Sequence, residues 1–406
     1  MKVLVFTTLY PNAASPNHGV FVENRVRNLV ADTGVSVRVI APVPWFPFSH
    51  PRFGVYAAHA RAPRREMRHG IAVIHPRYPV IPKIGMSLQP LLLYLGTRRA
   101  IRQMRAAFDF DVIDAHYFYP DGVAAVLHGR SVARPVVMTA RGNDLTLLPR
   151  YAGPRAWLRW AVRRAAGLAA VCDALRGDYV ERLGGRRADL RVLRNGVDLV
   201  HFTPDGPAAL SDLRSAGKRI VLSVGQLIER KGHHLTIEAL THLPDDVVLV
   251  IAGEGPERRR LQALAERLGV GERTVLLGSV GHGDLPAYYR AATLSVLASS
   301  REGWANVLLE SLACGTPVVA TAVSGTPEVI RSSVAGELVY ARSAACIAAA
   351  VNAVLARPPS AARVREYAEA FSWRETTEGQ MQLFQEARRC TGSASTAAPK
   401  GHDQAE

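Results

Sequence analysis

The sequence has no long hydrophobic run. No apolar stretch in its 406 residues reaches the roughly 18–20 residues that a membrane-spanning helix needs. The first ten residues, MKVLVFTTLY, are partly apolar, but no small-residue cleavage pattern follows them. We therefore expect a first buried strand there rather than a signal peptide.

Cysteine is also scarce. The four cysteines, Cys172, Cys314, Cys346 and Cys390, are scattered along the chain. This distribution argues against a disulfide framework or a zinc site and is typical of reduced thiols in a cytoplasm. We expect a cytoplasmic protein.

Acidic residues are scarce in one half of the chain. The whole sequence carries 50 Lys+Arg and 35 Asp+Glu, a net charge of +15. Residues 1–200 hold 29 basic and 13 acidic side chains (+16), and the remainder holds 21 and 22 (−1). The excess is densest from Arg52 to Arg105, where 11 basic residues accompany one acid, Glu66. Such a field attracts phosphorylated substrates, anionic lipid or nucleic acid. Because no RNA- or DNA-binding module signature is present, we expect no nucleic-acid partner.

Short apolar segments alternate with helical patterns along the whole chain. Buried strands are expected in the first half at KVLVFTT, VSVRVIAP, DVIDAH, PVVMTAR, GLAAVC and LRVLRNG, and in the second half at RIVLSVG, VVLVIAG, TVLLGSV, LSVLAS and PVVAT. Strands that alternate with helices form parallel sheets covered on both faces. Two consecutive sets predict an α/β protein with two Rossmann-like, doubly wound domains.

The predicted junction lies at residues 201–218, where Pro, Gly and Ser interrupt the pattern. We expect a first domain over residues 1–200 and a second over residues 201–370. A terminal helix over residues 371–390 is expected to pack back on the first domain. The small, polar end, residues 391–406, is expected to be disordered.

The stretch REGWANVLLESLACGTPVVA, residues 301–320, holds two carboxylates, Glu302 and Glu310. On one straight helix they would lie about 12 Å apart along the axis, whereas a paired-carboxylate hydrolase needs roughly 5–9.5 Å. Glu302 is instead expected in the loop after a strand, with a helix beginning near residues 304–306. The free N–H groups of residues 304–307 would then form an anion site between the two carboxylates. Taken singly, Glu302 could be a helix cap and Glu310 a solvated helix residue.

The pattern Glu-x7-Glu, followed by a small-residue turn and PVVA, resembles the nucleotide-sugar-dependent glycosyltransferases of family 4. Four further segments resemble the family in the right order: TARGNDL, RNGVDLVHF, SVGQLIERKGHHLTIEAL and IAGEGPERRRL. The resemblance covers nearly the whole chain. It implies a GT-B fold, in which the two domains face a central cleft where donor and acceptor meet. It also implies transfer of a sugar from a nucleoside diphosphate sugar to a hydroxyl, with retention at the anomeric carbon.

The resemblance also implies roles for individual residues. Arg230 and Lys231 would neutralise the donor diphosphate, Glu302 would touch the sugar and Glu310 would bind the ribose. His116, followed by Asp121 and Gly122, fills the position of a first-domain histidine at the donor sugar. The full set implied for the donor site is Gly19, Gly225, Gln226, Arg230, Lys231, Gly253, Gly255, Gly303, Trp304, Ala305, Asn306, Val307 and Glu310, with His116 and Glu302 as catalytic residues beside Arg230 and Lys231, and Arg141 and Asp144 on the acceptor side.

Two cationic side chains can stabilise the negative charge of a departing diphosphate without a metal. Asp109 and Asp111 form a D-x-D pair, the metal-binding pattern of another glycosyltransferase fold, but they precede a strand and are read as solvated residues. No essential metal or other cofactor is expected.

Several positions depart from the family pattern. Gln226 stands where an arginine is usual and removes one cation. Trp304 and Ala305 replace a hydrophobic-Gly pair and are expected to crowd the sugar. Arg141 replaces a histidine. The loop PNAASPNHGVF has one glycine where a pair is common.

The acceptor is inferred from the first half of the chain. The segment YPVIPKIGMSLQPLLLYLGTRRAIRQMR couples an apolar run to an arginine cluster. It is either part of an acceptor domain that touches the inner face of the cell membrane, or a surface loop followed by a buried helix with a solvated basic end. The first reading predicts a lipid-linked or glycan acceptor in cell-surface polysaccharide or glycolipid assembly, similar to bacterial enzymes of teichuronic-acid type.

Other activities stay open. A sugar-nucleotide epimerase of the same fold would turn over on the donor alone. A basic protein that binds sugar or nucleic acid without catalysis would leave Glu302, Glu310 and Lys231 unexplained together. An oxidoreductase is disfavoured because no complete G-x-G-x-x-G follows either first strand. The sequence leaves open the nucleobase, the sugar, the acceptor linkage and the oligomeric state.

Overall fold

The chain folds into two α/β units. The computed structural model describes residues 1–81 and 85–395. The first unit comprises Met1–Leu193 and the segment from Arg374 onward, and the second comprises Arg194–Trp373. Each is described by itself.

The division falls seven residues before the predicted junction. Arg194 already belongs to the second unit, because its guanidinium pairs with Glu328 at 2.5 Å. The amide of Val197 donates to the carbonyl of Phe371 at 2.9 Å, so residues 371–373 belong there too. The stretch rich in Pro, Gly and Ser therefore follows the junction instead of marking it.

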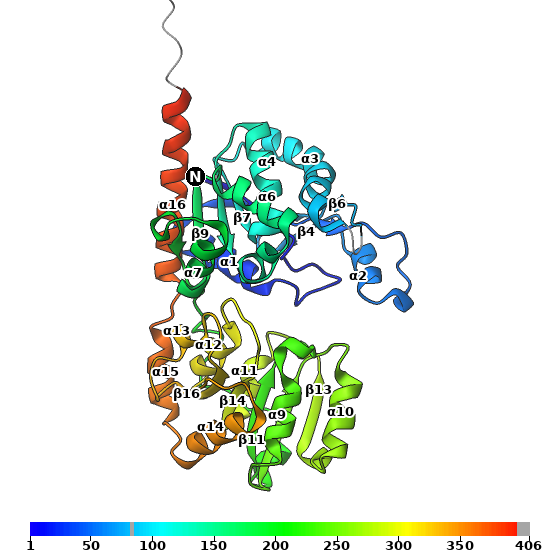
Figure 1. The fold of residues 1–406 in the computed structure, drawn as a ribbon, viewed down its shortest axis with the longest axis vertical. Helices are drawn as coiled ribbons and strands as arrows, with labels where there is room; N and C mark the ends of the chain where they lie inside the picture. Colours follow the sequence, from blue (N-terminus) through cyan, green and yellow to red (C-terminus); the bar gives the residue numbers. More distant parts are fainter. Residues whose placement is uncertain (82–84, 396–406) are drawn as a thin grey trace, which may run out of the picture. The chain divides into compact units, whose positions relative to one another are not determined.

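The first unit contains an eight-stranded sheet in the order β10-β9-β8-β7-β1-β2-β5-β4 (Figure 1). Neighbouring strands are parallel except for the β4–β5 pair. Its strands are β1 (Lys2–Phe6), β2 (Ser36–Ile40), β4 (Arg65–Arg68), β5 (Ile71–Ile74), β7 (Val112–His116), β8 (Val136–Ala140), β9 (Gly167–Ala170) and β10 (Arg191–Val192), beside a separate short pair of β3 (Val43–Pro44) and β6 (Arg77–Tyr78). Its helices are α1 (Val20–Thr33), α2 (Val55–Arg61), α3 (Gln89–Phe108), α4 (Val123–Val132), α5 (Asn143–Thr146), α6 (Ala152–Val162), α7 (Asp173–Leu183) and α16 (Arg374–Ser395).

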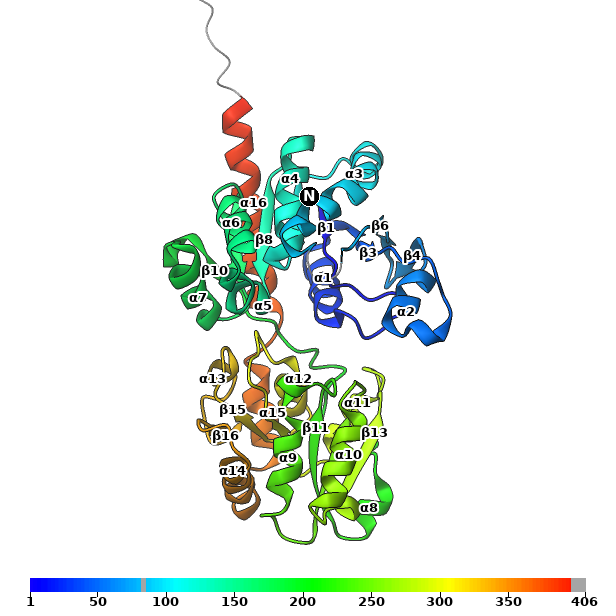
Figure 2. The ribbon, with the colours of Figure 1, turned by 45° about the vertical axis from the view of Figure 1, so that its right-hand side comes forward.

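Helices cover both faces of this sheet. On one face, α1 and α16 pack on an apolar core that includes Val3, Val112 and Val137. On the other face α3 packs against α4, and α4 contacts β7 and β8 (Figure 2). Because side chains alternate along a strand, Val112, Asp114 and His116 of β7 share the face that α1 and α16 cover.

The terminal helix α16 contacts α1, β7, β8 and β9 of the first unit. Arg25 of α1 donates to Gln380 of α16 at 2.8 Å. The helix continues to Ser395, so residues 391–395 are helical where disorder was predicted. The rest of the predicted tail, 396–406, lies outside the described residues.

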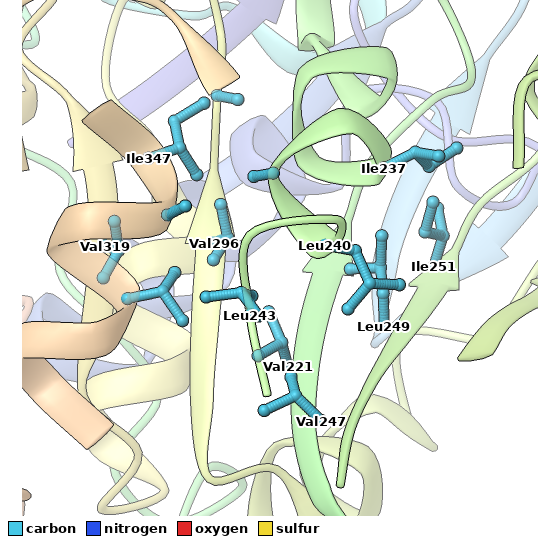
Figure 3. Packing of buried hydrophobic residues seen from close by; sticks show 14 of the residues in the cluster. Val221, Ile237, Leu240, Leu243, Val247, Leu249, Ile251, Val296, Val319 and Ile347 are labelled. Carbon is cyan, nitrogen blue, oxygen red and sulfur yellow. The ribbon is translucent and has the colours of Figure 1, made fainter. Parts of the chain in front are cut away.

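The second unit contains a six-stranded parallel sheet in the order β13-β12-β11-β14-β15-β16. Its strands are β11 (Arg219–Val224), β12 (Val247–Ala252), β13 (Thr274–Gly278), β14 (Leu294–Leu297), β15 (Val318–Thr321) and β16 (Gly336–Val339). Its helices are α8 (Ser211–Ser215), α9 (His233–Leu240), α10 (Arg258–Arg267), α11 (Leu285–Ala291), α12 (Asn306–Ala313), α13 (Thr326–Val329), α14 (Ala344–Ala356) and α15 (Ala361–Glu369). Figure 3 shows the core between the strands and the helices α9 and α14, in which Ile237, Leu240 and Ile347 share one cluster with Val221 and Val296.

The predicted strands are present in both units, and the α/β class with two Rossmann-like domains is confirmed. The β4–β5 hairpin was missed because its strands are four residues each and β4 carries two arginines and one glutamate. It makes one edge of the first sheet antiparallel. Strand β16 was also missed, since GELV offers little alternation.

Among the described residues, no single helix is long and apolar enough to span a membrane. One pair, Ala344–Ala356 with Ala361–Arg389, passes on length and composition alone, but it is bent by 112°.

Candidate functional site

Two loops meet at the carboxyl edge of the second sheet. Strand β11 leads into residues 225–232 before α9, and β14 leads into residues 298–305 before α12. These strands are neighbours although residues 225–293 separate them in the sequence, because the strand order reverses between them. The amide of Ser300 donates to the carbonyl of Arg230 at 2.8 Å, and the Arg230 guanidinium donates to the carbonyl of Arg301 at 2.8 Å. In open α/β sheets such a switch point is where ligands bind.

Glu302 lies at the centre of these loops. Its carboxylate accepts from Lys231 Nζ at 2.7 Å and from Ser299 Oγ at 2.6 Å, and Arg230 Nη1 lies 3.6 Å away. Burial alone would raise the pKa of the Glu302 carboxyl, but Lys231, Ser299 and Arg230 outweigh it and hold the pKa below its ordinary value. The carboxylate is therefore ionised, and two cations around one anion leave a net positive charge at this edge.

Glu310 lies on α12 and faces a different set of partners. Its carboxylate accepts from Tyr289 Oη at 3.1 Å and lies 3.3 Å from His282 Nε2. The pKa of Tyr289 is well above its usual value because the phenol is buried and adjoins the Glu310 carboxylate. The His282 ring stacks on His201, with 5.9 Å between ring centroids. Tyr289 and His282 were not predicted as site residues.

The glycines after β12 allow the backbone there to lie close to the backbone of the loop after β11. A Cβ on Gly253 would lie 1.9 Å from the carbonyl oxygen of Gly225, and one on Gly255 would lie 2.4 Å from that of Leu227. The amide of Leu227 donates to the carbonyl of Glu254 at 2.9 Å. These glycines therefore allow the loop that carries Arg230 and Lys231 to pack on its neighbour. Gly225 has φ 155° and lies against the side chain of Lys231.

The side chain of Gln226 is exposed, and the carbonyl oxygen of this residue lies 3.2 Å from His233 Nε2. The position adds no cation to the loop, as the sequence indicated.

The Trp304 side chain takes part in packing. Its indole Nε1 donates to the carbonyl of Asn195 at 3.0 Å, and its ring lies against Phe371. The segment that begins the unit therefore covers this ring, and its expected effect on the sugar stays a prediction. Ala305 is buried as well.

The start of α12 is less open than expected. The amide of Asn306 donates to the carbonyl of Trp304 at 3.2 Å, and the Asn306 side chain accepts from Asn195 at 3.2 Å. One of the amides expected to bind an anion is thus already engaged. Gly303 and Val307 flank this turn.

His116 is fully buried at the end of β7 in the first unit. Its Nδ1 lies 2.7 Å from Arg141 Nη2 and its Nε2 lies 3.1 Å from Asp114 Oδ2. Since arginine can only donate, Nδ1 accepts and the ring proton sits on Nε2, toward Asp114. Burial lowers the pKa of His116 to about 4. The attraction of Asp114 opposes this shift, and the repulsion of Arg141 adds to it. Both ring nitrogens face protein groups, so His116 is a neutral link between two charged side chains.

The terminal helix closes this buried network. Gln380 Nε2 donates to Asp114 Oδ2 at 2.7 Å, and Gln380 Oε1 accepts from Arg25. Arg141, the replacement for a histidine, stacks on Phe21 with 5.5 Å to the ring centroid. The position of His116 therefore depends on α1 and α16, which its sequence neighbourhood does not reveal.

Asp144 and Gly19 order loops of the first unit. The Asp144 carboxylate accepts from the amides of Phe118 at 2.8 Å and Gly142 at 2.7 Å. Burial raises the pKa of Asp144 against these bonds. A Cβ on Gly19, which has φ 71°, would lie 2.3 Å from the carbonyl carbon of Leu9. Asp144 thus holds a turn together, and its place on the acceptor side stays a prediction.

The described part of the chain holds no group of three or more His, Cys, Asp or Glu side chains placed to bind a metal. Asp109 ends α3 and pairs with Arg134 at 3.0 Å, and Asp111 accepts from the amide of Lys2 at 2.8 Å. The two carboxylates of the D-x-D pair thus have separate partners.

The buried state of His116 predicts a pH dependence of stability. Because its folded pKa of about 4 lies below the ordinary value near 6.5, the unfolded chain takes up the proton first. Stability is then lost as the pH falls from about 6.5 toward 4. The His116→Gln variant lacks this proton, and glutamine can still accept from Arg141 and donate to Asp114. Between pH 7 and 4, the unfolding free energy of His116→Gln should fall by roughly 2–3 kcal/mol less than that of the wild type.

Urea unfolding at several pH values measures the difference. His242→Gln, at an exposed histidine, controls for the loss of an imidazole. Parallel curves for the wild type and His116→Gln would contradict the proposed neutral state.

The comparisons with known proteins agree with this fold. The family described as Glycosyltransferase Family 4 matches residues 18–201, and Glycosyl transferases group 1 matches residues 211–371. The chain is a glycosyltransferase of family 4 with the GT-B fold.

Its relatives include proteins with stated activities. Bacillus subtilis TuaC, assigned to teichuronic acid biosynthesis as a glycosyltransferase, is 30% identical over 363 residues, which are 87% of this chain and 88% of TuaC. A D-inositol 3-phosphate glycosyltransferase of Geodermatophilus obscurus is 32% identical over 361 residues, 83% of this chain and 80% of that protein. The structure of Anabaena HepE in complex with UDP-glucose shares the fold with a TM-score of 0.69 and 21% identity, over 97% of this chain and 100% of HepE.

Proposed function

We propose that this glycosyltransferase moves a sugar from a nucleoside diphosphate sugar to a hydroxyl acceptor, with retention at the anomeric carbon. The observation that carries the proposal is the cluster of Lys231, Arg230 and Glu302 at the switch point of the second sheet. Glu310 lies on α12, the helix that follows the same loop, and its partners Tyr289 and His282 lie on α11 and just before it.

Each group in this arrangement suits one part of such a donor. Lys231 and Arg230 attract a diphosphate, because two cations surround one carboxylate. Glu310 accepts hydrogen bonds from ribose hydroxyls, and the His282 ring, stacked beside it on His201, offers a flat surface to a base. Glu302 accepts from hydroxyls of the sugar. The complex of HepE with UDP-glucose supports a donor of this class.

The proposed reaction balances without an added base. The bond between the anomeric carbon and the diphosphate oxygen breaks, and a bond from the same carbon to the acceptor oxygen forms on the same face. The acceptor proton passes to the departing diphosphate oxygen. The cations stabilise the charge that develops on the diphosphate, a task that in this proposal needs no metal.

The proposed acceptor is a lipid-linked or glycan hydroxyl at the inner face of the cell membrane, in cell-surface polysaccharide or glycolipid assembly. The similarity to TuaC and the basic excess of residues 52–105 support it. The protein would then be cytoplasmic and bind the membrane peripherally.

A thermal-shift panel of nucleoside diphosphates tests the donor class. One of them, at a concentration about a hundred times its Kd, should raise the Tm by about 5–10 °C. The matching sugar nucleotide should then release nucleoside diphosphate faster when a hydroxyl acceptor is added. No stabilisation by any nucleotide would refute the proposal. Conversion of the donor sugar without nucleotide release would identify an epimerase instead.

A further inference from the structure

Exposed large hydrophobic side chains are concentrated in one stretch of the first unit. Of the eleven such residues in the described chain, eight lie between positions 45 and 95: Trp45, Phe48, Tyr56, Met67, Val80, Ile81, Leu88 and Leu95. The same stretch overlaps the segment with 11 basic residues and one acid. Single exposed apolar residues are ordinary, but their concentration beside a basic excess is not.

The helix α3 shows how the two features combine. Its inner face buries Pro90, Leu93, Thr97, Ile101, Met104 and Phe108. At about 100° per residue, the opposite face carries Leu88, Leu92 and Leu95, followed on the same line by Arg99 and Arg102. Leu88 and Leu95 are 51% and 58% exposed. The outward stripe thus changes along the helix from leucine to arginine.

A water-facing helix surface is polar along its whole length, so the leucine half of this stripe departs from that pattern. Arg98, Arg99 and Arg102 are exposed and form no ion pair with any described residue. By contrast Arg105, on the same helix, pairs with Asp109. The three arginines therefore present uncompensated charge next to exposed leucines, and the reading of α3 as a buried helix with a solvated basic end leaves Leu88 and Leu95 unexplained.

The leucine end of α3 lies at the carboxyl edge of the first sheet. The helix connects through residues 109–111 to the start of β7, so its far end lies at the other edge. Tyr119, just beyond the end of β7, donates through its hydroxyl to the carbonyl of Met86, just before α3. Trp157 Nε1 donates to the carbonyl of Ser87 at 2.9 Å. The exposed leucines thus lie on the same edge of the sheet as Arg141, where β8 ends.

We infer that the outward face of α3 docks on an anionic lipid bilayer. Leu88, Leu92 and Leu95 enter the interfacial region, and Arg98, Arg99 and Arg102 bind headgroup phosphates. The arginines are complementary to anionic headgroups. The stripe carries leucines instead of the aromatic rings on which bases stack, which favours lipid over single-stranded nucleic acid. The rings of Phe46, Phe48 and Phe53, which lie in the same stretch of sequence, pack on one another. The inference deepens the proposed function by naming the surface that brings a lipid-linked acceptor to the enzyme, and it rests on that function only for this purpose.

Flotation with vesicles tests the inference directly. The full-length protein is mixed with phosphatidylcholine vesicles, with or without an equal part of phosphatidylglycerol, at low and high salt. Wild type should bind the anionic vesicles and lose binding at high salt. The triple variant R98Q/R99Q/R102Q should bind about a hundredfold more weakly at low salt. The double variant L88S/L95S should bind about tenfold more weakly and keep its salt dependence.

Matched controls come from the second unit. R259Q/R260Q/R267Q removes three arginines from α10, and V200S/Y340S removes the two exposed hydrophobic residues of that unit. Both should bind vesicles as the wild type does. Equal vesicle binding by the α3 variants and the wild type would overturn the inference. So would wild-type binding of single-stranded oligonucleotide in preference to vesicles, with L88S/L95S unaffected.

An activity assay separates this inference from the proposed function. The α3 variants should transfer sugar from the donor to a soluble hydroxyl acceptor, with release of nucleoside diphosphate, at the wild-type rate. They should lose transfer only to an acceptor embedded in vesicles. If no donor turns over in any variant, the proposed function fails, while the vesicle binding still decides the role of α3.

Discussion

Replacing Lys231 by alanine is expected to lower the rate of sugar transfer by a thousandfold or more. Lys231 Nζ lies 2.7 Å from Glu302 at the switch point of the second sheet. In the proposed reaction it faces the diphosphate that gathers negative charge as the sugar departs. A single cation aimed at such charge contributes about 10³–10⁵ in rate in phosphoryl-transfer enzymes, and the same electrostatic argument applies here. Steady-state kinetics of nucleotide release measure the effect.

A second variant separates this chemical role from a structural one. Lys231→Ala leaves the buried Glu302 carboxylate without its nearest cation, which should cost roughly 3 kcal/mol of stability. The double variant K231A/E302Q removes the unpaired charge, so it should recover most of the stability while transfer stays lost. Arg260→Ala, at an exposed arginine paired with Glu257, is the matched control and should keep full activity. Near-normal transfer in Lys231→Ala would refute the proposed diphosphate site.

Replacing Glu310 by alanine is expected to weaken nucleotide binding about a hundredfold. Tyr289 and His282 orient the carboxylate, and its remaining lone pairs are proposed to accept from two ribose hydroxyls. Hydrogen bonds to a charged group contribute about 1.5–3 kcal/mol each, so losing both, at the lower end of this range, should raise the Kd by about two orders of magnitude. Titration calorimetry with the nucleoside diphosphate that stabilises the wild type gives the Kd.

Tyr289→Phe is the partner variant for this prediction. It removes the phenol that donates to Glu310 at 3.1 Å but keeps the carboxylate, so binding should weaken about tenfold or less. An unchanged Kd in Glu310→Ala would show that ribose binds elsewhere. A larger loss in Tyr289→Phe than in Glu310→Ala would assign the nucleotide contact to the phenol.

Much of the fold follows from local patterns in the sequence. Short apolar segments bounded by turns were enough to predict the strands. The alternation of these strands with helices then predicted two units with parallel sheets. The antiparallel β4–β5 edge did not follow, because its residues REMR and IAVI form strands only when they pair with each other and with β2. The junction was misplaced because Arg194 and Val197 are held by Glu328 and Phe371, residues more than 130 positions away.

The candidate site likewise has features that the sequence indicated and features that only the structure shows. The sequence pointed to Glu302, Glu310, Arg230 and Lys231 through their spacing and the family resemblance. It could not show that Lys231 pairs with Glu302, that Tyr289 donates to Glu310, or that the Trp304 ring packs on Asn195 and Phe371. Each of these contacts joins segments of the chain whose residues meet only after distant strands have paired.

The sequence by itself determined the α/β class, the two domains and the residue types of the site, because strand and helix periodicity and loop chemistry are local properties. The tertiary structure decided which charges are paired and which faces are covered. His116 is a buried neutral link because α1 and α16 cover its side of the sheet. The outward leucines of α3 are exposed because no described element packs over them. Periodicity assigns a residue to a face of an element, but only the packing of distant elements determines whether that face meets protein or stays exposed.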